Sequence, residues 1–200
     1  MQTLKEYEKG CYITVFFYLW RFNIMNYKKL ILYTVDDNYV EELTKIDSKI
    51  AHNKSDSRTH TRKYIGILFE INGLKYFVNL SSYKPWKHDK MAESIDFIKI
   101  GTYAVINLNN MMPVIEGRYH SVDFNQVTDN KYKQLLKNEY GIIKTKSAQI
   151  IKNANIVYKH KITNGNETSL ARRCCDFKKL EMYAIQKQKN YETEVACYKV

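Results

Sequence analysis

The alternation of apolar and polar residues predicts strands over the first part of the chain. The segment KKLILYTV at 28–35 is rich in apolar and β-favouring residues and predicts one strand. The clearest signal is a pair of β-rich runs, at 64–71 and 74–80, that flank the dipeptide Asn72-Gly73. Asn-Gly between two such runs strongly indicates a β-hairpin, because both residues tolerate the positive φ of a tight turn.

Further strands are predicted downstream of this hairpin. One covers IDFIKI at 95–100, and another covers TYAVINL at 102–108 and runs on to MMPVIEG at 111–117. Pro113 cannot donate to a sheet ladder, so it indicates a sheet edge or a break within the last run. Residues 28–117 are therefore predicted to be mainly β, with the short loops that are typical of a small barrel.

Helical signals surround this β region. The segment DNYVEELTKID has capping residues at 36–38 and an apolar face, which predicts a short helix. Residues 47–63 are polar and basic and predict a loop. Beyond a candidate cap at 128–129, apolar residues recur at helical spacing. A second helix is predicted over 168–187, after the turn at 164–166.

The pattern divides the chain into an extension, one domain and a tail. A single α+β domain is expected over 25–187, with its helical part at about 128–187, and 188–200 are expected to form a tail. Residues 1–24 form an N-terminal extension, which we interpret as the product of a misassigned start; an added strand or short helix is the alternative. No apolar run approaches the roughly 18 residues of a membrane span, so no membrane partner is expected.

The net charge of the chain indicates which class of partner it binds. The 32 Lys and Arg outnumber the 21 Asp and Glu, which gives a net charge of +11. Residues 131–200 hold 15 of these cations and 6 of the acids, so nine of the eleven net charges lie there. Tyrosines interleave with the cations and offer stacking surfaces beside phosphate contacts, which favours a nucleic acid as partner. The alternative is a lysine-rich, solvated surface.

Other residues exclude several classes of chemistry. The four cysteines form no CxxC pair, and the five histidines show no metal-ligand spacing. The sequence contains no phosphate-binding loop, dinucleotide fingerprint or HExxH motif. We therefore expect no metal, no cofactor and a reduced, cytoplasmic setting.

One segment stands out as candidate chemistry. LSSYKPWKH at 80–88 follows a strand and holds two hydroxyls, three basic side chains and a tryptophan. A second basic cluster, RTHTRK at 58–63, precedes the paired strand. In a hairpin centred on its Asn-Gly turn, residues 62–63 fall near Ser82 and Lys84. Hydroxyl, ammonium and guanidinium groups are thereby expected at one end of the sheet.

Two interpretations of this cluster are open. The structural one is a turn capped by serines, with the tryptophan packed on the barrel and solvated lysines around it. The functional one is a phosphate site in which cations neutralise charge that develops on a phosphoryl group. RNA carries its own nucleophile, the 2′-hydroxyl, so an enzyme has only to align it, stabilise the transition state and protonate the leaving oxygen. Such chemistry requires no metal.

Several of these segments together resemble a known family. The resemblance rests on elements in a fixed order: YIGILFEI from Tyr64, LSSYK from Leu80 before Trp86, INL at 106–108, MPVIE at 112–116, and a helix beginning at Lys131-Tyr132. Over about residues 27–183 the chain is similar to the ToxN/AbiQ family, the toxin endoribonucleases of type III toxin–antitoxin systems.

The resemblance implies a fold, an activity and a partner. The fold would be a small antiparallel β-barrel of the MazF/Kid (SH3-like) type, elaborated with several helices. The activity would be metal-independent RNA cleavage that leaves 2′,3′-cyclic phosphate and 5′-hydroxyl ends. A repeated pseudoknot RNA would act as antitoxin in a cyclic protein–RNA assembly, and release of the toxin would cause growth arrest or phage abortive infection.

The resemblance also implies roles for individual residues. Ser82 would be the central active-site hydroxyl, with Ser81 as a phosphate-positioning neighbour. Lys84 would support acid–base work or transition-state charge, and Arg62 would be a basic active-site residue upstream of the strand. His60 could replace a tyrosine of the family pattern, because an intrinsic pKa near ~6.5 suits proton transfer. An ungapped comparison places Arg58 at that tyrosine, so the identity of the general acid stays open.

Other basic and aromatic residues are candidates for RNA contacts rather than chemistry. They are Lys63, Trp86, Lys87, Lys131, Lys133, Lys144, Lys146, Arg172 and Arg173. A solvated helix face is the alternative interpretation for each of the helical ones. For the whole chain, a non-catalytic RNA- or DNA-binding module is the alternative to a nuclease.

Overall fold

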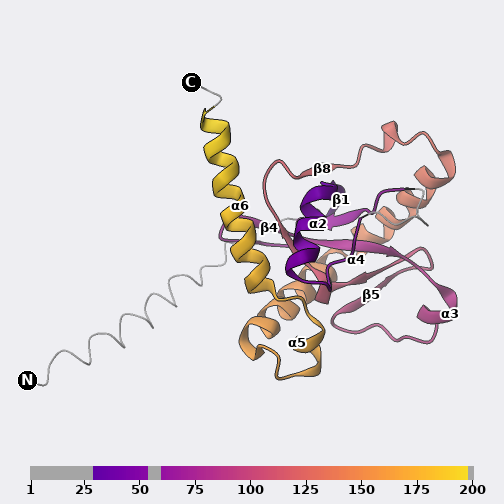
Figure 1. The fold of residues 1–200 in the computed structure, drawn as a ribbon. Coiled ribbons are helices and arrows are strands. Elements are labelled where there is room, and N and C mark those ends of the chain that lie inside the picture. Colours follow the sequence, from indigo (N-terminus) through magenta and orange to yellow (C-terminus); the bar gives the residue numbers. More distant parts are fainter. Residues whose placement is uncertain (1–28, 54–59, 198–200) are drawn as a thin grey trace, which may run out of the picture.

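The computed structural model describes residues 29–53 and 60–197, and an eight-stranded sheet with helices on both sides forms its body (Figure 1). The predicted extension at 1–24 lies outside the described residues. In chain order the strands are β1 (Ile31–Val35), β2 (Tyr64–Gly66), β3 (Glu70–Ile71), β4 (Leu74–Ser82), β5 (Phe97–Ile100), β6 (Ala104–Asn107), β7 (Met112–Val114) and β8 (Tyr119–Ser121). Their spatial order is β5-β6-β4-β2-β1-β8, with β3 and β7 also paired to β4.

The predicted hairpin is confirmed, but its register changes along its length. Asn72 and Gly73 have φ values of 52° and 77° and turn the chain from β3 into β4. Near the turn Glu70 pairs with Lys75, whereas further out Ile65 pairs with Val78. Between these two pairs the upstream side has four residues, whereas β4 has only two. This two-residue bulge moves the far end of the upstream strand along β4.

The prediction of a closed barrel is wrong. β5 and β8 end the strand order and do not pair with each other in the described residues, so the sheet is open. β4 is the long central strand, with β2 and β3 along one edge and β6 and β7 along the other. The terminal strands span only four and three residues, and helices rather than a closing strand pair cover the sheet. The antiparallel sheet with several helices is confirmed.

The described residues form five helices. They are α2 (Asp37–Ile46), α3 (Pro85–His88), α4 (Asn130–Asn164), α5 (Ser169–Arg173) and α6 (Phe177–Cys197), with 3₁₀ turns at Leu108–Asn110 and Phe124–Gln126. Three of them, α2, α4 and α5, begin where the capping residues predict. The carboxylate of Asp36 accepts the Tyr39 N–H at 2.8 Å, and the carboxylate of Asp129 caps α4 in the same way. Gly165, with a φ of 53°, ends α4 at the predicted turn.

The single helix predicted over 168–187 is in fact two. α5 ends at Arg173, and α6 begins only at Phe177 and runs on to Cys197. Between them the Cys175 N–H donates to the Asn109 carbonyl oxygen at 2.8 Å, and the Asp176 N–H donates to Asp47. These tertiary hydrogen bonds replace helical ones, which is why the break is not visible in the apolar spacing.

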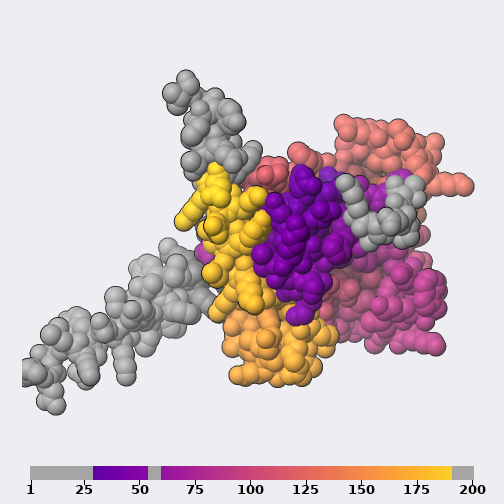
Figure 2. Space-filling view, in the orientation of Figure 1, coloured from indigo at the N-terminus to yellow at the C-terminus, as the bar shows by residue number. Residues whose placement is uncertain are grey.

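Helices on opposite sides enclose the core. α2 lies in front of the sheet and α4 behind it in Figure 1, and α6 lies beside α2 on the surface seen in Figure 2. Glu42 on α2 accepts hydrogen bonds from the Tyr183 hydroxyl at 2.8 Å and the Lys187 ammonium at 2.9 Å on α6. One continuous cluster of buried apolar side chains joins the sheet to these helices. In the part of the chain that the structure describes, none of the helices combines the length and apolar character needed to cross a membrane.

Candidate active site

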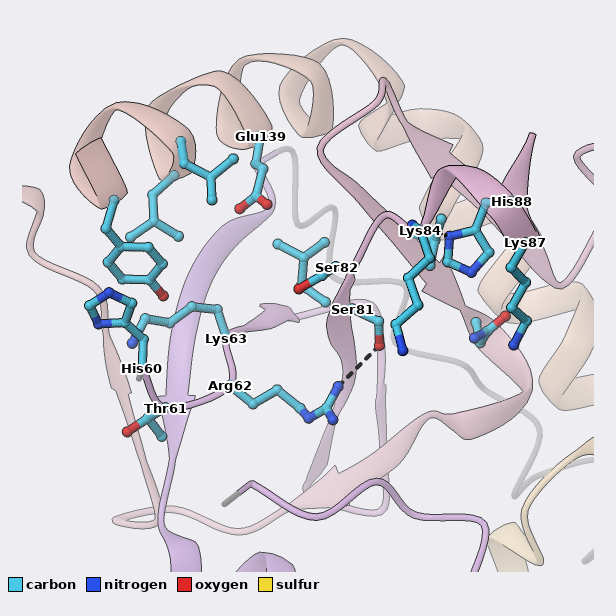
Figure 3. Close-up of a pocket in the computed structure, with 16 residues that line it drawn as sticks. His60, Thr61, Arg62, Lys63, Ser81, Ser82, Lys84, Lys87, His88 and Glu139 are labelled. Atoms are coloured by element: carbon cyan, nitrogen blue, oxygen red, sulfur yellow. Dashed lines mark hydrogen bonds between the residues drawn. The ribbon is translucent and has the colours of Figure 1, made fainter. Parts of the chain in front are cut away.

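The sheet end predicted to gather hydroxyls and cations lines a pocket of about 550 Å³ between β4 and α4 (Figure 3). The lining residues come from the segment before β2, the end of β4, α3, β6 and the first turns of α4. They are His60, Thr61, Arg62, Lys63, Leu80, Ser81, Ser82, Lys84, Lys87, His88, Val105, Asn107, Tyr132, Leu135, Leu136 and Glu139. All five predicted catalytic residues are among them, as are the predicted RNA contacts Lys63 and Lys87.

Ser81 is held by donors on both sides. Its hydroxyl oxygen accepts the Arg62 Nη1–H at 3.0 Å and the Asn79 Nδ2–H at 2.8 Å. With both lone pairs occupied, the Ser81 proton is left to donate toward the pocket. Ser82, the next residue, is exposed and also faces the pocket.

Arg62 is fixed by its second hydrogen bond as well as by Ser81. Its Nε–H donates to the His52 carbonyl oxygen at 3.1 Å. Arg62 was expected opposite Ser82 and Lys84, and it lies opposite Ser81 instead, because the bulge between β2 and β3 shifts the register by two residues. The prediction that these groups meet at one sheet end is confirmed.

Lys84 is positioned by a histidine that the sequence analysis overlooked. Lys84 precedes α3, and its backbone N–H donates to Nδ1 of His88 at 2.9 Å. Burial of His88, helped by the charges of Lys87, Lys84 and Lys99, lowers the pKa of this imidazole. A neutral ring with Nδ1 as acceptor carries its proton on Nε2. The spacing of four residues across a Pro-initiated turn is the signal that could have identified His88.

Trp86 lies at the outer side of this group. Its side chain is 75% exposed, and the Lys84 ammonium lies 5.9 Å from the centroid of its ring. The prediction that this tryptophan packs on a barrel, part of the structural interpretation, is wrong. An exposed indole beside a cation is available to stack on a base.

His60 and Lys63 stand at the opposite end of the pocket. The His60 ring stacks on the Tyr132 ring, with centroids 3.8 Å apart and planes 7° from parallel. His60 Nε2 lies 3.6 Å from a carboxylate oxygen of Asp129. The Lys63 ammonium lies 5.9 Å from the Tyr132 ring centroid, and its burial lowers the pKa of Lys63.

The α4 wall is chemically different from the strand wall. Tyr132, Leu135, Leu136 and Glu139 share one face of the helix, and Figure 3 shows Glu139 pointing from α4 into the pocket. Glu139 is 5% exposed, and its burial raises its pKa to about 7. The sequence analysis overlooked this residue, although a lone acid on an apolar helix face was visible in the spacing.

The remaining predicted RNA contacts lie outside the pocket and fall into two groups. Lys131 and Lys144 are exposed on α4, and Lys133 is half-buried there. The other three make internal hydrogen bonds: Lys146 to Glu93 and Lys99, Arg172 to the carbonyl oxygens of residues 166 and 167, and Arg173 to Asp96. Within residues 29–53 and 60–197, no three His, Cys, Asp or Glu side chains are grouped as a metal site would require.

Several known proteins are similar to this chain in sequence or fold. Endoribonuclease ToxN of Bacillus thuringiensis subsp. kurstaki is 32% identical over 160 residues, which cover 74% of this chain and 79% of the relative. Endoribonuclease AbiQ of Lactococcus lactis subsp. lactis is 28% identical over 163 residues, which cover 76% and 86%. A chain solved in a study of type III toxin inhibition by a non-coding RNA pseudoknot has a TM-score of 0.68 and 30% identity, covering 82% of this chain and 98% of that one.

The family itself is established by a match over most of the chain. The model for the toxin ToxN of type III toxin–antitoxin systems matches residues 31–185. That range includes every residue that lines the pocket. The chain therefore belongs to the ToxN toxin family of type III toxin–antitoxin systems.

Proposed function

We propose that this protein is a metal-independent, sequence-selective endoribonuclease toxin. The observation that carries the proposal is the strand wall of the pocket, where two serine hydroxyls face a guanidinium and an ammonium. Arg62 and Lys84 place positive charge where a phosphate would bind, and Ser81 supplies an oriented hydroxyl proton. Membership of a family whose relatives are named endoribonucleases supports the same conclusion.

The proposed reaction is an in-line transfer within the RNA. The 2′-oxygen bonds to the adjacent phosphorus while the bond from phosphorus to the 5′-oxygen breaks, which gives a 2′,3′-cyclic phosphate and a 5′-hydroxyl. A base removes the 2′-hydroxyl proton, and an acid protonates the leaving oxygen. Ser82 orients the phosphate, and the cations of Arg62 and Lys84 neutralise the charge on its oxygens in the transition state.

His60 is the proposed proton carrier. Its Nε2 lies 3.6 Å from a carboxylate oxygen of Asp129, which helps to orient the ring. Its stacking on Tyr132 holds the imidazole at the pocket wall. His88 is assigned a different role, because its Nδ1 is already engaged with the Lys84 N–H.

The proposed regulator is an RNA antitoxin. The net charge of +11 suits a polyanion, and the neighbour described above was solved in work on inhibition by an RNA pseudoknot. We expect a repeated pseudoknot RNA to close with the toxin into a cyclic assembly. Loss of that RNA would free the nuclease and cause growth arrest or phage abortive infection.

Total bacterial RNA incubated with the purified protein in EDTA tests the nuclease. We expect new ends that carry 2′,3′-cyclic phosphate with the wild type and none with Ser82→Ala. Ser169→Ala, at an exposed serine outside the pocket, is the matched control and should cleave normally. RNA binding without cleavage by the wild type would instead support the non-catalytic binding module.

A further inference from the structure

The α4 wall of the pocket holds a carboxyl group that the proposed reaction does not use. Glu139 is 5% exposed and lines the same pocket as Ser82 and Lys84. In the described residues, no side chain or backbone N–H donates a hydrogen bond or forms an ion pair with its carboxyl group. The carboxyl group points into the pocket and has no donor from the described residues, so it indicates a place where a ligand supplies the donor.

The surroundings of Glu139 suit a flat, partly apolar ligand. Leu135 and Leu136 lie one turn away on the same helix face and line the pocket with it. Another turn along, Tyr132 is stacked on His60 and forms an aromatic surface at the pocket wall. Proteins recognise unpaired RNA bases by this combination of apolar or aromatic contact with hydrogen bonds to the base edge.

The two walls of the pocket therefore suit different parts of a nucleotide. The cations and hydroxyls of the strand wall suit the phosphate, as proposed above. A base attached to that phosphate can then lie against the α4 wall. The carboxyl of Glu139 on that wall points into the pocket (Figure 3).

We propose that Glu139 is a specificity-determining residue that accepts a hydrogen bond from the exocyclic amino group of a base beside the scissile phosphate. Adenine, cytosine and guanine each carry such an amino group, whereas uracil presents carbonyl oxygens at the corresponding edges. The carboxyl keeps an acceptor oxygen in both of its protonation states, so the amino group is the feature the two states share. This inference rests on the proposed nuclease function.

Base analogues test the contact without changing the protein. Cleavage sites of the full-length wild type are first mapped on a mixed RNA pool. Oligonucleotides are then made with purine riboside for adenosine, inosine for guanosine or pyrimidin-2-one riboside for cytidine, each of which deletes the amino group. At one position beside the scissile bond we expect the matching analogue to be cleaved about 10-fold or more slowly, because it leaves the acceptor unpaired.

Variants at Glu139 show whether this residue is the acceptor. Glu139→Leu should cleave the natural base and its analogue at equal rates, whatever its overall rate. Glu139→Gln keeps the shape but adds an N–H donor, so the preference for the amino base over uracil should fall at least about fivefold. Glu167→Gln removes an exposed acid outside the pocket and should keep the wild-type preference.

The outcomes separate this inference from the one on which it rests. No cleavage by the wild type would overturn the nuclease and the inference together. Wild-type cleavage that tolerates every analogue within twofold would overturn the inference alone, as would an unchanged base preference in Glu139→Gln. If Glu139→Leu failed to fold, the analogue scan on the wild type and the Glu139→Gln ratio would still decide.

Discussion

The two walls of the pocket are built on opposite principles. On the strand wall several polar groups are fixed by partners: Ser81 accepts two hydrogen bonds, Arg62 makes two, and the Lys84 N–H is paired with His88. On the α4 wall apolar side chains surround Glu139, whose carboxyl group has no donor among the described residues. The first arrangement fixes groups for chemistry, and the second leaves an unmet hydrogen bond for a ligand. Variants on the two walls should therefore fail in different ways.

The largest effect is expected on the strand wall, at Lys84. Lys84→Ala removes the ammonium that is proposed to face the phosphate and should lower kcat about 10²- to 10³-fold, as loss of a transition-state stabiliser does. RNA affinity should change only by about one phosphate contact. Single-turnover cleavage and binding to an RNA with a 2′-deoxy substitution measure the two quantities.

Lys90→Ala is the control for this change, because Lys90 is an exposed lysine just beyond α3 and does not line the pocket. It should cleave like the wild type. A similar loss of rate in both variants would mean that Lys84 acts only through general charge.

The next effect concerns the stability of the α4 wall. Burial raises the pKa of Glu139 to about 7, above its value in an unfolded chain. The folded state therefore binds this proton more tightly, so the stability is fully present below about pH 4 and is lost as the pH rises through 7. Up to about 3 kcal/mol should be lost between pH 5 and pH 8.5.

Denaturant unfolding at several pH values measures this loss. Glu139→Gln cannot ionise, so it should lack the decline and exceed the wild type in stability at pH 8.5. Glu167→Gln should follow the wild-type profile. If the free energy of unfolding depended on pH in the same way for the wild type and Glu139→Gln, ionisation of the Glu139 carboxyl would not destabilise the fold.

A smaller effect is expected from the support behind Lys84. His88→Ala removes the acceptor of the Lys84 N–H and should lower kcat about 10-fold, with little change in RNA affinity. His88→Asn restores an acceptor near the position of Nδ1 and should recover most of the rate. A loss of stability alone, with kcat unchanged in both variants, would reduce His88 to a packing residue.

The sequence was informative where local chemistry decides the structure. The Asn72-Gly73 turn, the Asp36 and Asp129 caps and the Gly165 helix end follow from the conformational preferences of those residues. The meeting of Arg62 with the serines of β4 was predictable from the same turn. Its register was not, because the bulge between β2 and β3 depends on packing rather than on the turn.

Features that depend on distant partners were less predictable. The break between α5 and α6 follows from hydrogen bonds to Asn109 and Asp47, far away in the sequence. The prediction of a closed barrel was wrong because pairing between the first and last strands of a sheet leaves no local pattern in the sequence. Glu139 was overlooked for the opposite reason: its helix was predicted, but only the tertiary fold turns that face toward the serines of β4.

The smallest effects separate cations that can bind RNA from cations that serve the fold. Lys131 is exposed at the start of α4, and no acidic side chain in the described ranges forms an ion pair with its ammonium. Lys146 instead donates to Glu93 at 2.8 Å and to the Lys99 carbonyl oxygen at 3.0 Å, which joins α4 to β5. Lys131→Met should reduce the slope of log affinity against log salt by about 1, as loss of one phosphate contact does.

Lys146→Met should leave that slope unchanged and lower the free energy of unfolding by about 1 kcal/mol or less, because the ion pair is partly exposed. Both variants are compared in a Ser82→Ala background, so that the RNA stays intact during titration. Equal salt slopes for the two variants would mean that the cations of α4 attract RNA only through their summed charge and not through individual phosphate contacts. Unequal slopes would mean that Lys131 contacts an RNA phosphate, whereas Lys146 stabilises the fold.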